Sequence, residues 1–279
     1  MFFKPFYFPT LRFMNKRTIY TLLIIVCIVG FWLFENFYTP ATYSPEKEGN
    51  NTEVIIEDLL PNSTFGSIAR HEYYILSYSE PHEQAEWVAY PLKREHLTNA
   101  SRKRPYFIED PKIKSKSADW RNYRGSGYDR GHLVPAGDRR FSEQAYNETF
   151  YTSNISPQDR DFNAGIWNRL EQKVRYWCKT YGDLVVITGG VLIDRLEEIG
   201  EEDVDVPEAF YKIIYRETKN GAEVISFLIP NQESNLSLEN FVVSIDKLEQ
   251  ETKLDFFAKQ SETWQEKTES LASTDGWKF

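Results

Sequence analysis

The sequence is poor in the residues that build disulfide scaffolds and zinc sites. Its 279 residues include two cysteines and four histidines, and two cysteines cannot form a disulfide-rich scaffold or a four-cysteine zinc site. The histidines are separated by 11, 14 and 36 residues, so they form no local zinc motif. Internal repeats, low-complexity tracts and the nucleophile elbow of serine hydrolases are also absent. The 41% hydrophobic and 27% charged residues indicate an ordinary globular protein.

Positive charge is in deficit overall but is concentrated in one stretch. The formal net charge of −9 argues against a uniformly basic protein that coats nucleic acid. Between residues 91 and 140, however, 13 Lys and Arg residues stand against 6 Asp and Glu residues, so this stretch carries +7 and the remainder −16. A basic stretch in an acidic protein indicates a binding site for a polyanion, although a solvated lysine-rich face gives the same count.

An uncharged apolar run lies near the N-terminus. It extends from Thr18 to Phe34, 17 residues, which is the short end of what spans a bilayer. Basic residues precede it and an acidic residue follows, so we expect residues 1–17 to be cytoplasmic and residues 18–36 to be a single-pass signal anchor. The remainder would then be extracytoplasmic, in a periplasm or at the cell surface. A cleaved signal peptide, which would give a secreted protein, is the alternative.

Composition divides the rest of the chain into three parts. Residues 37–61 are polar and contain proline, glycine and asparagine, so they are expected to form a linker. Residues 62–258 carry the apolar periodicity of a globular domain. Residues 259–279 are expected to form a polar, frayed tail.

The globular part contains both strand and helix signals. Aromatic and β-branched runs predict one hairpin from residues 73–78 and 86–90 and a second from residues 210–215 and 223–229, around Asn220-Gly221. A continuous apolar run at residues 184–188 predicts a buried central strand. Residues 165–180 predict a helix with one apolar stripe, formed by Trp167, Leu170, Val174 and Trp177. We therefore expect an α+β fold with a mostly antiparallel central sheet flanked by helices.

One segment, residues 125–136, concentrates residues suited to catalysis. Its three glycines favour a rigid loop. Arg130 and His132 lie two residues apart, so an extended backbone would direct both to one side, and Gly131 would leave room for a ligand. Hydrolysis of a phosphodiester needs a base to activate water and a cation to bind the phosphate, and this pair supplies both. A structural role is the alternative for a single histidine.

A second group of polar residues follows between residues 152 and 171. Asn163 begins the predicted helix, where it would act either as an N-cap or as an oxygen ligand of Mg²⁺, which keeps most of its waters. Glu171 lies eight residues later, about 12 Å along an unbroken helix. We therefore expect Glu171 to act through ordered water or a bend, or to pair with Arg175 at position i+4.

These motifs together resemble the DNA/RNA non-specific endonuclease family, the ββα-metal nucleases of the Serratia nuclease and endonuclease G type. The resemblance rests on Asp129-Arg130-Gly131-His132, on residues 153–158, on Asn163 and on residues 167–171. It extends over roughly Tyr73 to Phe257 through residues 87–90, 104–107, 123–127, 188–190 and 206–207. The implied fold is the ββα-metal nuclease fold.

The resemblance implies catalytic roles for four residues. His132 would be the general base that deprotonates the attacking water, and Arg130 would neutralise charge on the pentavalent phosphate. Asn163 would be the direct protein ligand of one Mg²⁺, with Mn²⁺ as the alternative ion, and Glu171 would orient the metal-bound waters. Since the base must be neutral, activity is expected to fall as the pH drops below the pKa of the imidazole.

The resemblance also implies how substrate is bound. Arg104, Arg124 and Asn154 would be substrate-binding positions, with Asp129 in a supporting role. Arg102 and Arg124 compete with Arg104 for the match to the upstream phosphate-binding arginine of the family. DNA and RNA would both be cut with little sequence preference, because contacts to phosphates and sugars carry no base information. The products would be 5′-phosphates and 3′-hydroxyls. A homodimer, as found in parts of the family, is compatible with the sequence.

A membrane-tethered polyanion-binding module without catalysis is the alternative function. Such a module needs the arginines but has no use for His132, Asn163 and Glu171 together. All three are present, which favours the enzyme.

Overall fold

The computed structural model describes residues 15–38, 43, 56–62, 66–219 and 221–279. The chain divides into two units, Met1–Pro40 and Ala41–Phe279. The first contains α1 (Lys16–Phe37). Its stretch Lys16–Phe34 is long and apolar enough to cross a membrane, but a signal sequence near an N-terminus meets the same criterion. Most of the expected linker, residues 37–61, lies outside the described residues.

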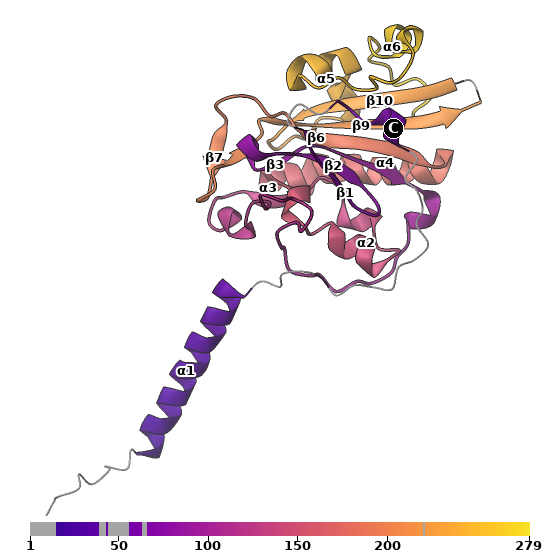
Figure 1. The fold of residues 1–279 in the computed structure, drawn as a ribbon. Helices are drawn as coiled ribbons and strands as arrows, with labels where there is room; N and C mark the ends of the chain where they lie inside the picture. The colour runs from indigo at the N-terminus through magenta and orange to yellow at the C-terminus, as the bar shows by residue number, and fades with distance from the viewer. Residues whose placement is uncertain (1–14, 39–42, 44–55, 63–65, 220) are drawn as a thin grey trace, which may run out of the picture. The chain divides into compact units, whose positions relative to one another are not determined.

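A seven-stranded sheet forms the centre of the larger unit (Figure 1). The strands follow the order β1-β2-β3-β6-β9-β10-β11, and every neighbouring pair is antiparallel. Their bounds are Ser67–Arg70 (β1), Ile75–Ser79 (β2), Gln84–Leu92 (β3), Leu184–Gly190 (β6), Ala209–Thr218 (β9), Gly221–Pro230 (β10) and Val242–Val243 (β11). The predicted α+β fold with a mostly antiparallel central sheet is confirmed.

Both predicted hairpins are present in this sheet. In the first, Ile75 of β2 pairs with Ala89 of β3. The second is longer than predicted, because its pairing extends to Thr218 and Gly221, on either side of Asn220, which lies outside the described residues. The predicted central strand is β6, which lies between β3 and β9.

Alternation of side chains along the strands creates two apolar layers. On β9, Phe210 and Ile214 are buried toward α4 (Asn168–Tyr181). Tyr211 and Ile213 are buried on the opposite face, with side chains of α5 (Ile245–Thr252). Figure 1 shows α5 and α6 (Glu262–Thr268) on one side of the sheet and α4 on the other. Side chains of successive residues on the strand therefore point into different apolar layers.

The predicted helix at residues 165–180 is interrupted near its start. All four residues of its predicted apolar stripe are buried, at 0–1% exposure. The regular α-helix, however, begins only at Asn168 and is preceded by α3 (Arg160–Phe162) and a π-helical turn, Asn163–Trp167. Within that turn Gly165 has φ −97° and ψ −106°, which are not helical angles. The chain therefore bends between Asn163 and the body of α4.

A two-stranded sheet replaces the loop expected around the Asp-Arg-Gly-His motif. Here β4 (Asp129–His132) pairs with β5 (Ile155–Gln158), and Gly131 lies opposite Ser156. A Cβ atom at position 131 would lie 2.1 Å from Cδ of Gln158, so glycine is required for this close pairing. The rigid loop expected over this segment is therefore wrong for residues 129–132, where the glycine allows close strand pairing.

Two further elements complete the unit. A second small sheet pairs β7 (Glu197–Ile199) with β8 (Val204–Val206). The short helix α2 (Glu143–Glu148) begins after Ser142, whose hydroxyl accepts a hydrogen bond from the amide of Ala145.

The C-terminal segment packs on the core, in contrast to the frayed tail expected from its polarity. Residues 262–268 form α6. Trp277 is buried against Trp177 of α4, with ring centroids 4.9 Å apart, and the indole of Trp177 donates a hydrogen bond to the carbonyl of Lys278 at 2.8 Å. Aromatic residues near the end of the segment outweigh its polar composition.

Candidate active site

His132, the last residue of β4, lies against two aromatic rings. Its imidazole is 4.9 Å from the ring of Phe150 in an edge-to-face arrangement and 5.7 Å from the ring of Phe107. The Nε2 atom is buried and has no hydrogen-bond partner among the described residues. A buried nitrogen without a partner is costly unless a ligand or water satisfies it.

The surroundings of His132 favour its neutral form. Burial first, and then the positive charges of Arg104 and Arg130, lower the pKa of His132 to about 3. The ordinary pKa of histidine is about 6.5, so the imidazole is neutral throughout the neutral pH range. A neutral imidazole with an available nitrogen can accept a proton.

Two arginines gather over the ring of Phe107, beside His132. The guanidinium carbon of Arg130 lies 4.7 Å from the ring centroid and that of Arg104 lies 5.4 Å from it. Burial first, and then repulsion by Arg104, lower the pKa of Arg130, although it stays charged. An anion that enters between the two guanidinium groups would relieve this repulsion.

The contacts of Arg102 and Arg104 indicate which of the two is available to bind phosphate. Arg102 donates hydrogen bonds to the carbonyls of Arg140 (2.9 Å) and Phe141 (3.2 Å), so it is engaged by the backbone. The exposed Arg104 instead contributes positive charge at His132. The guanidinium carbon of Arg124 lies 5.1 Å from the ring centroid of Trp120.

Trp120 connects Arg124 to the same positive surface. The guanidinium carbon of Arg130 lies 5.5 Å from the ring centroid of Trp120, so Arg124 and Arg130 both contact this ring. The three arginines predicted from the sequence therefore line one continuous positive surface over Phe107 and Trp120. The aromatic rings were not among the predicted site residues, because their positions depend on the tertiary fold.

Asn163 is held by Asp129, the first residue of β4. The side-chain amide of Asn163 donates a hydrogen bond to Oδ2 of Asp129 at 3.0 Å. This contact directs the amide nitrogen to the carboxylate and leaves Oδ1 of Asn163 as an oxygen donor. The donor set of an amide oxygen beside a carboxylate fits a hard divalent cation such as Mg²⁺.

The alternative role of Asn163 as a helix N-cap is wrong. The N-cap is Asp159, whose Oδ1 accepts hydrogen bonds from the amides of Asp161 and Phe162, both at 2.9 Å. Asn163 instead begins the π-helical turn after α3. Its side chain is therefore not needed to start the helix.

Glu171 forms the pair with Arg175 that its spacing allowed. A terminal nitrogen of Arg175 donates to Oε2 of Glu171 at 3.1 Å, and Nε of the same arginine donates to the buried Asp138. Burial raises the pKa of Glu171, and the charges of Arg175 and Lys212 oppose this rise. Whether Glu171 acts through ordered water, as expected from the sequence, stays a prediction.

Lys212 is a charged residue near the site that sequence reasoning missed. It is 1% exposed in the middle of β9, its Nζ donates to the hydroxyl of Thr188 at 3.2 Å, and it lies 4.6 Å from the ring of Trp167. Burial lowers the pKa of Lys212 to about 8, against the opposing effect of Glu171. A lysine inside an otherwise apolar strand was the signal that could have found it.

Asn154 supports the backbone and does not face the substrate surface. It is fully buried, its Oδ1 accepts from the amide of Val134 at 2.9 Å, and its Nδ2 donates to the carbonyls of Val134 and Thr149. All its polar atoms are thereby used within the fold. This corrects the expectation that Asn154 binds substrate: it fixes the chain just after His132.

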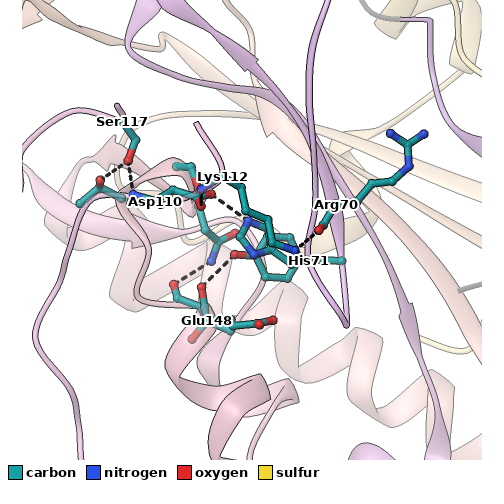
Figure 2. Close-up of polar contacts among 11 residues, drawn as sticks. Arg70, His71, Asp110, Lys112, Ser117 and Glu148 are labelled. Atoms are coloured by element: carbon teal, nitrogen blue, oxygen red, sulfur yellow. Dashed lines mark hydrogen bonds and ion pairs between the residues drawn. The ribbon is translucent and has the colours of Figure 1, made fainter. Parts of the chain in front are cut away.

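A buried polar network fixes the segment that carries Phe107 (Figure 2). His71 is within hydrogen-bond distance of Oδ2 of Asp110 (2.8 Å), and Ser153 donates to the same oxygen at 2.5 Å. Burial alone would raise the pKa of Asp110, but the hydrogen bonds from His71 and Ser153 bring it below its ordinary value. His71 therefore acts as a structural residue, which holds Asp110 ionised three residues after Phe107.

The predicted residues meet in two groups that share β4. His132 and Arg130 lie with Arg104 beside Phe107, while Asp129 of the same strand holds Asn163. The combination provides a neutral proton acceptor, fixed positive charges and an oxygen ligand set. Groups of these three kinds are suited to the hydrolysis of a phosphate ester.

Comparison with known proteins agrees with this chemistry. Residues 53–263 match the sequence model described as DNA/RNA non-specific endonuclease. The mitochondrial nuclease EXOG of Danio rerio is 36% identical over 201 residues, which cover 66% of this chain and 59% of the relative. Mitochondrial endonuclease G of Bos taurus is 35% identical over 201 residues, 66% of each chain. The chain thus spans less than two thirds of the length of these relatives.

A solved structure gives the same result for the fold. The crystal structure of the EndoG/EndoGI complex, described as revealing the mechanism of EndoG inhibition, contains a chain similar to this one with a TM-score of 0.65 and 33% sequence identity. The similarity covers 70% of this chain and 86% of that one.

The comparisons contradict the location expected from the sequence. The relatives are mitochondrial nucleases, which disagrees with a single-pass membrane protein whose catalytic domain is extracytoplasmic. The reason for the error is physical: α1 has the length and apolar composition of an anchor, but targeting sequences near an N-terminus share both properties.

Proposed function

The chain belongs to the DNA/RNA non-specific endonuclease family, and we propose that it is a metal-dependent endonuclease that hydrolyses phosphodiester bonds in DNA and RNA. The observation that carries this proposal is the buried Nε2 of His132, which has no hydrogen-bond partner in the described part of the chain and feels the charges of Arg104 and Arg130, on the strand that also holds Asn163 through Asp129.

In the proposed reaction His132 is the general base. Nε2 takes a proton from water, the water oxygen forms a bond to phosphorus, and the bond from phosphorus to the 3′ oxygen breaks. The leaving oxygen carries the electron pair away and takes a proton from solvent to give the 3′-hydroxyl, while the phosphate stays on the 5′ end. His132 then releases to solvent the proton that it accepted. The lowered pKa of His132 supports this role because it keeps the ring unprotonated before substrate binds.

Arg130 and Arg104 bind and neutralise the phosphate. Their guanidinium groups are positioned over Phe107 before the substrate arrives, and their mutual repulsion favours an anion between them. Electrostatic stabilisation of this kind is usually the largest contribution of an enzyme to hydrolysis. Arg124 extends the positive surface along Trp120 for a neighbouring phosphate.

The side-chain oxygen of Asn163 would hold a divalent cation, with Mg²⁺ as the first choice and Mn²⁺ as the alternative. When bound, such a cation supplies positive charge close to the developing negative charge on the phosphate and the leaving oxygen. Asp129 orients Asn163. Glu171, held by Arg175, would accept hydrogen bonds from water near the site.

A cleavage assay with the full chain tests the proposal. The purified chain is incubated with supercoiled plasmid and, separately, with a structured RNA, in 5 mM Mg²⁺ with or without EDTA. We expect fragments with 5′-phosphate ends in the presence of metal and none with EDTA or with the His132→Ala variant. Intact plasmid that is nevertheless retained in a gel-shift assay would instead support the binding module without catalysis.

A further inference from the structure

Three carboxylates come together on the side of the sheet away from α4. Asp246 and Glu249 belong to α5, and Glu269 follows the last turn of α6. One oxygen atom of each lies within 4.8 Å of the others. The amide of Asp246 also donates to the carbonyl of Glu269 at 3.1 Å, so the backbone holds the two segments in register.

Glu269 is the unusual member of this group. It is 9% exposed, and its Oε1 is buried without a hydrogen-bond partner among the described residues. A cavity of about 360 Å³, lined in part by Asp246 and Glu269, opens beside it. A buried carboxylate oxygen without a partner costs free energy unless a proton or a cation satisfies it.

No side-chain cation compensates the three acids. Lys247, the neighbour of Asp246 on α5, forms its ion pair with Glu251. Within the described residues, no lysine, arginine or histidine makes a salt bridge to Asp246, Glu249 or Glu269. Burial first, and then the charges of Glu249, Asp246 and Asp255, raise the pKa of Glu269 to about 7. The group therefore has no ion-pair partner among the residues that the structure describes.

We propose that Asp246, Glu249 and Glu269 bind a Ca²⁺ ion that joins the end of α6 to α5. Three carboxylates with room for water provide the oxygen ligands that Ca²⁺ prefers at about 2.3–2.6 Å. Oxygens on opposite sides of such an ion are about 5 Å apart, so a separation within 4.8 Å requires little rearrangement. The site is separate from the nuclease residues and its role is to stabilise the C-terminal segment.

Calcium binding is measured in the full chain carrying Asn163→Ala, so that the nuclease metal site does not contribute. After treatment with EDTA and dialysis, Ca²⁺ is titrated at pH 7.5 and both thermal stability and bound calcium are recorded. We expect one Ca²⁺ per chain and a rise in Tm on the order of 5 °C at saturation. Glu269→Gln should abolish both effects, whereas Glu262→Gln, an exposed acid on the rim of the same cavity, should retain them.

Two further measurements keep the test decisive. Asp246→Asn changes an exposed ligand, so it should fold normally, lose calcium binding and keep nuclease activity in an otherwise native chain. If the parent chain binds no calcium, the proposal is wrong; a rise in Tm in Glu269→Gln would then show that the carboxylate of Glu269 is destabilising and is not neutralised by a cation. Binding that persists in both Glu269→Gln and Asp246→Asn would also overturn it. Neither result bears on the proposed nuclease activity, which is assayed separately.

Discussion

The side-chain amide of Asn163 donates a hydrogen bond to the carboxylate of Asp129 at 3.0 Å, which joins the π-helical turn to the first residue of β4. This contact decides which atom of Asn163 faces outward. Because the nitrogen is occupied by the carboxylate, the oxygen is the atom available to a hard cation. The orientation of the proposed metal ligand is therefore set by a residue of the motif that also contains His132.

Replacement of Asn163 by alanine should raise the Mg²⁺ concentration required for half-maximal cleavage at least tenfold and lower the maximal rate. Asp129→Ala should produce a smaller shift in the same direction, because it removes the orientation and keeps the ligand. Plasmid cleavage over a Mg²⁺ titration measures both. An unchanged metal requirement in Asn163→Ala would refute the ligand assignment.

Replacement of His132 by alanine should lower kcat by about 10²–10⁴-fold or more, because it removes the proton acceptor. His96→Ala is a matched control: His96 is also buried with a pKa lowered to about 4 by burial, but it stacks on Phe141. Circular dichroism would establish that both variants fold. Comparable losses of activity in the two variants would indicate that the effect of His132 is only structural.

The pH dependence of stability should reflect the lowered pKa of His132. Between pH 6.5 and about 3 the unfolded chain binds a proton on this residue while the folded chain does not, so the residue lowers the stability of the folded state as the pH falls through this window. His132→Gln should therefore reduce the loss of stability on acidification from pH 7 to pH 4. Denaturant unfolding at several pH values measures this, and parallel curves for the two proteins would contradict it.

The two arginines near the site should respond differently to substitution. Arg104→Ala should weaken substrate binding. It should also reduce the slope of log K against log salt concentration by about 1, the value expected for the loss of one phosphate contact. Arg102→Ala removes hydrogen bonds to two backbone carbonyls, so it should mainly lower Tm. The affinity for a non-cleaved oligonucleotide, measured between 50 and 200 mM salt, distinguishes the two variants. Equal salt slopes in the native chain and in Arg104→Ala would exclude Arg104 from the binding surface.

Gly131→Ala should destabilise the β4–β5 pair by about 1–3 kcal/mol. The added methyl group would overlap the side chain of Gln158, which is fully buried. Thermal unfolding of Gly131→Ala, Gln158→Ala and the double variant measures the coupling. If overlap is the cause, the double variant should be more stable than the sum of the single effects predicts.

The central features of the fold could be read from local sequence patterns. The apolar runs at residues 184–188 and 210–215 identified β6 and β9 because these strands are buried on both faces. β4 was misread as a loop because its glycine serves a close contact with Gln158, a residue that is distant in sequence. Trp277 was missed for a similar reason, since its partner Trp177 lies a hundred residues earlier.

Some residues of the candidate site could likewise be identified from the sequence, and others could not. The Asp-Arg-Gly-His motif and Asn163 could be found from their order along the chain. The rings of Phe107 and Phe150, which lie against His132, and the buried Lys212 could not, because their proximity arises only when the sheet and its flanking segments assemble. The residues proposed to act directly on the substrate or metal were thus readable from the sequence, and the residues that surround them were not.

The stacking of arginines on Phe107 and Trp120 has a consequence for the thermodynamics of association. A free arginine side chain loses rotational freedom worth roughly 2 kcal/mol when it is ordered. In Arg104, Arg124 and Arg130 the rings already restrict that freedom during folding. Contact with a polyanion then requires little further ordering, so the entropy of released counterions should dominate the measured entropy change.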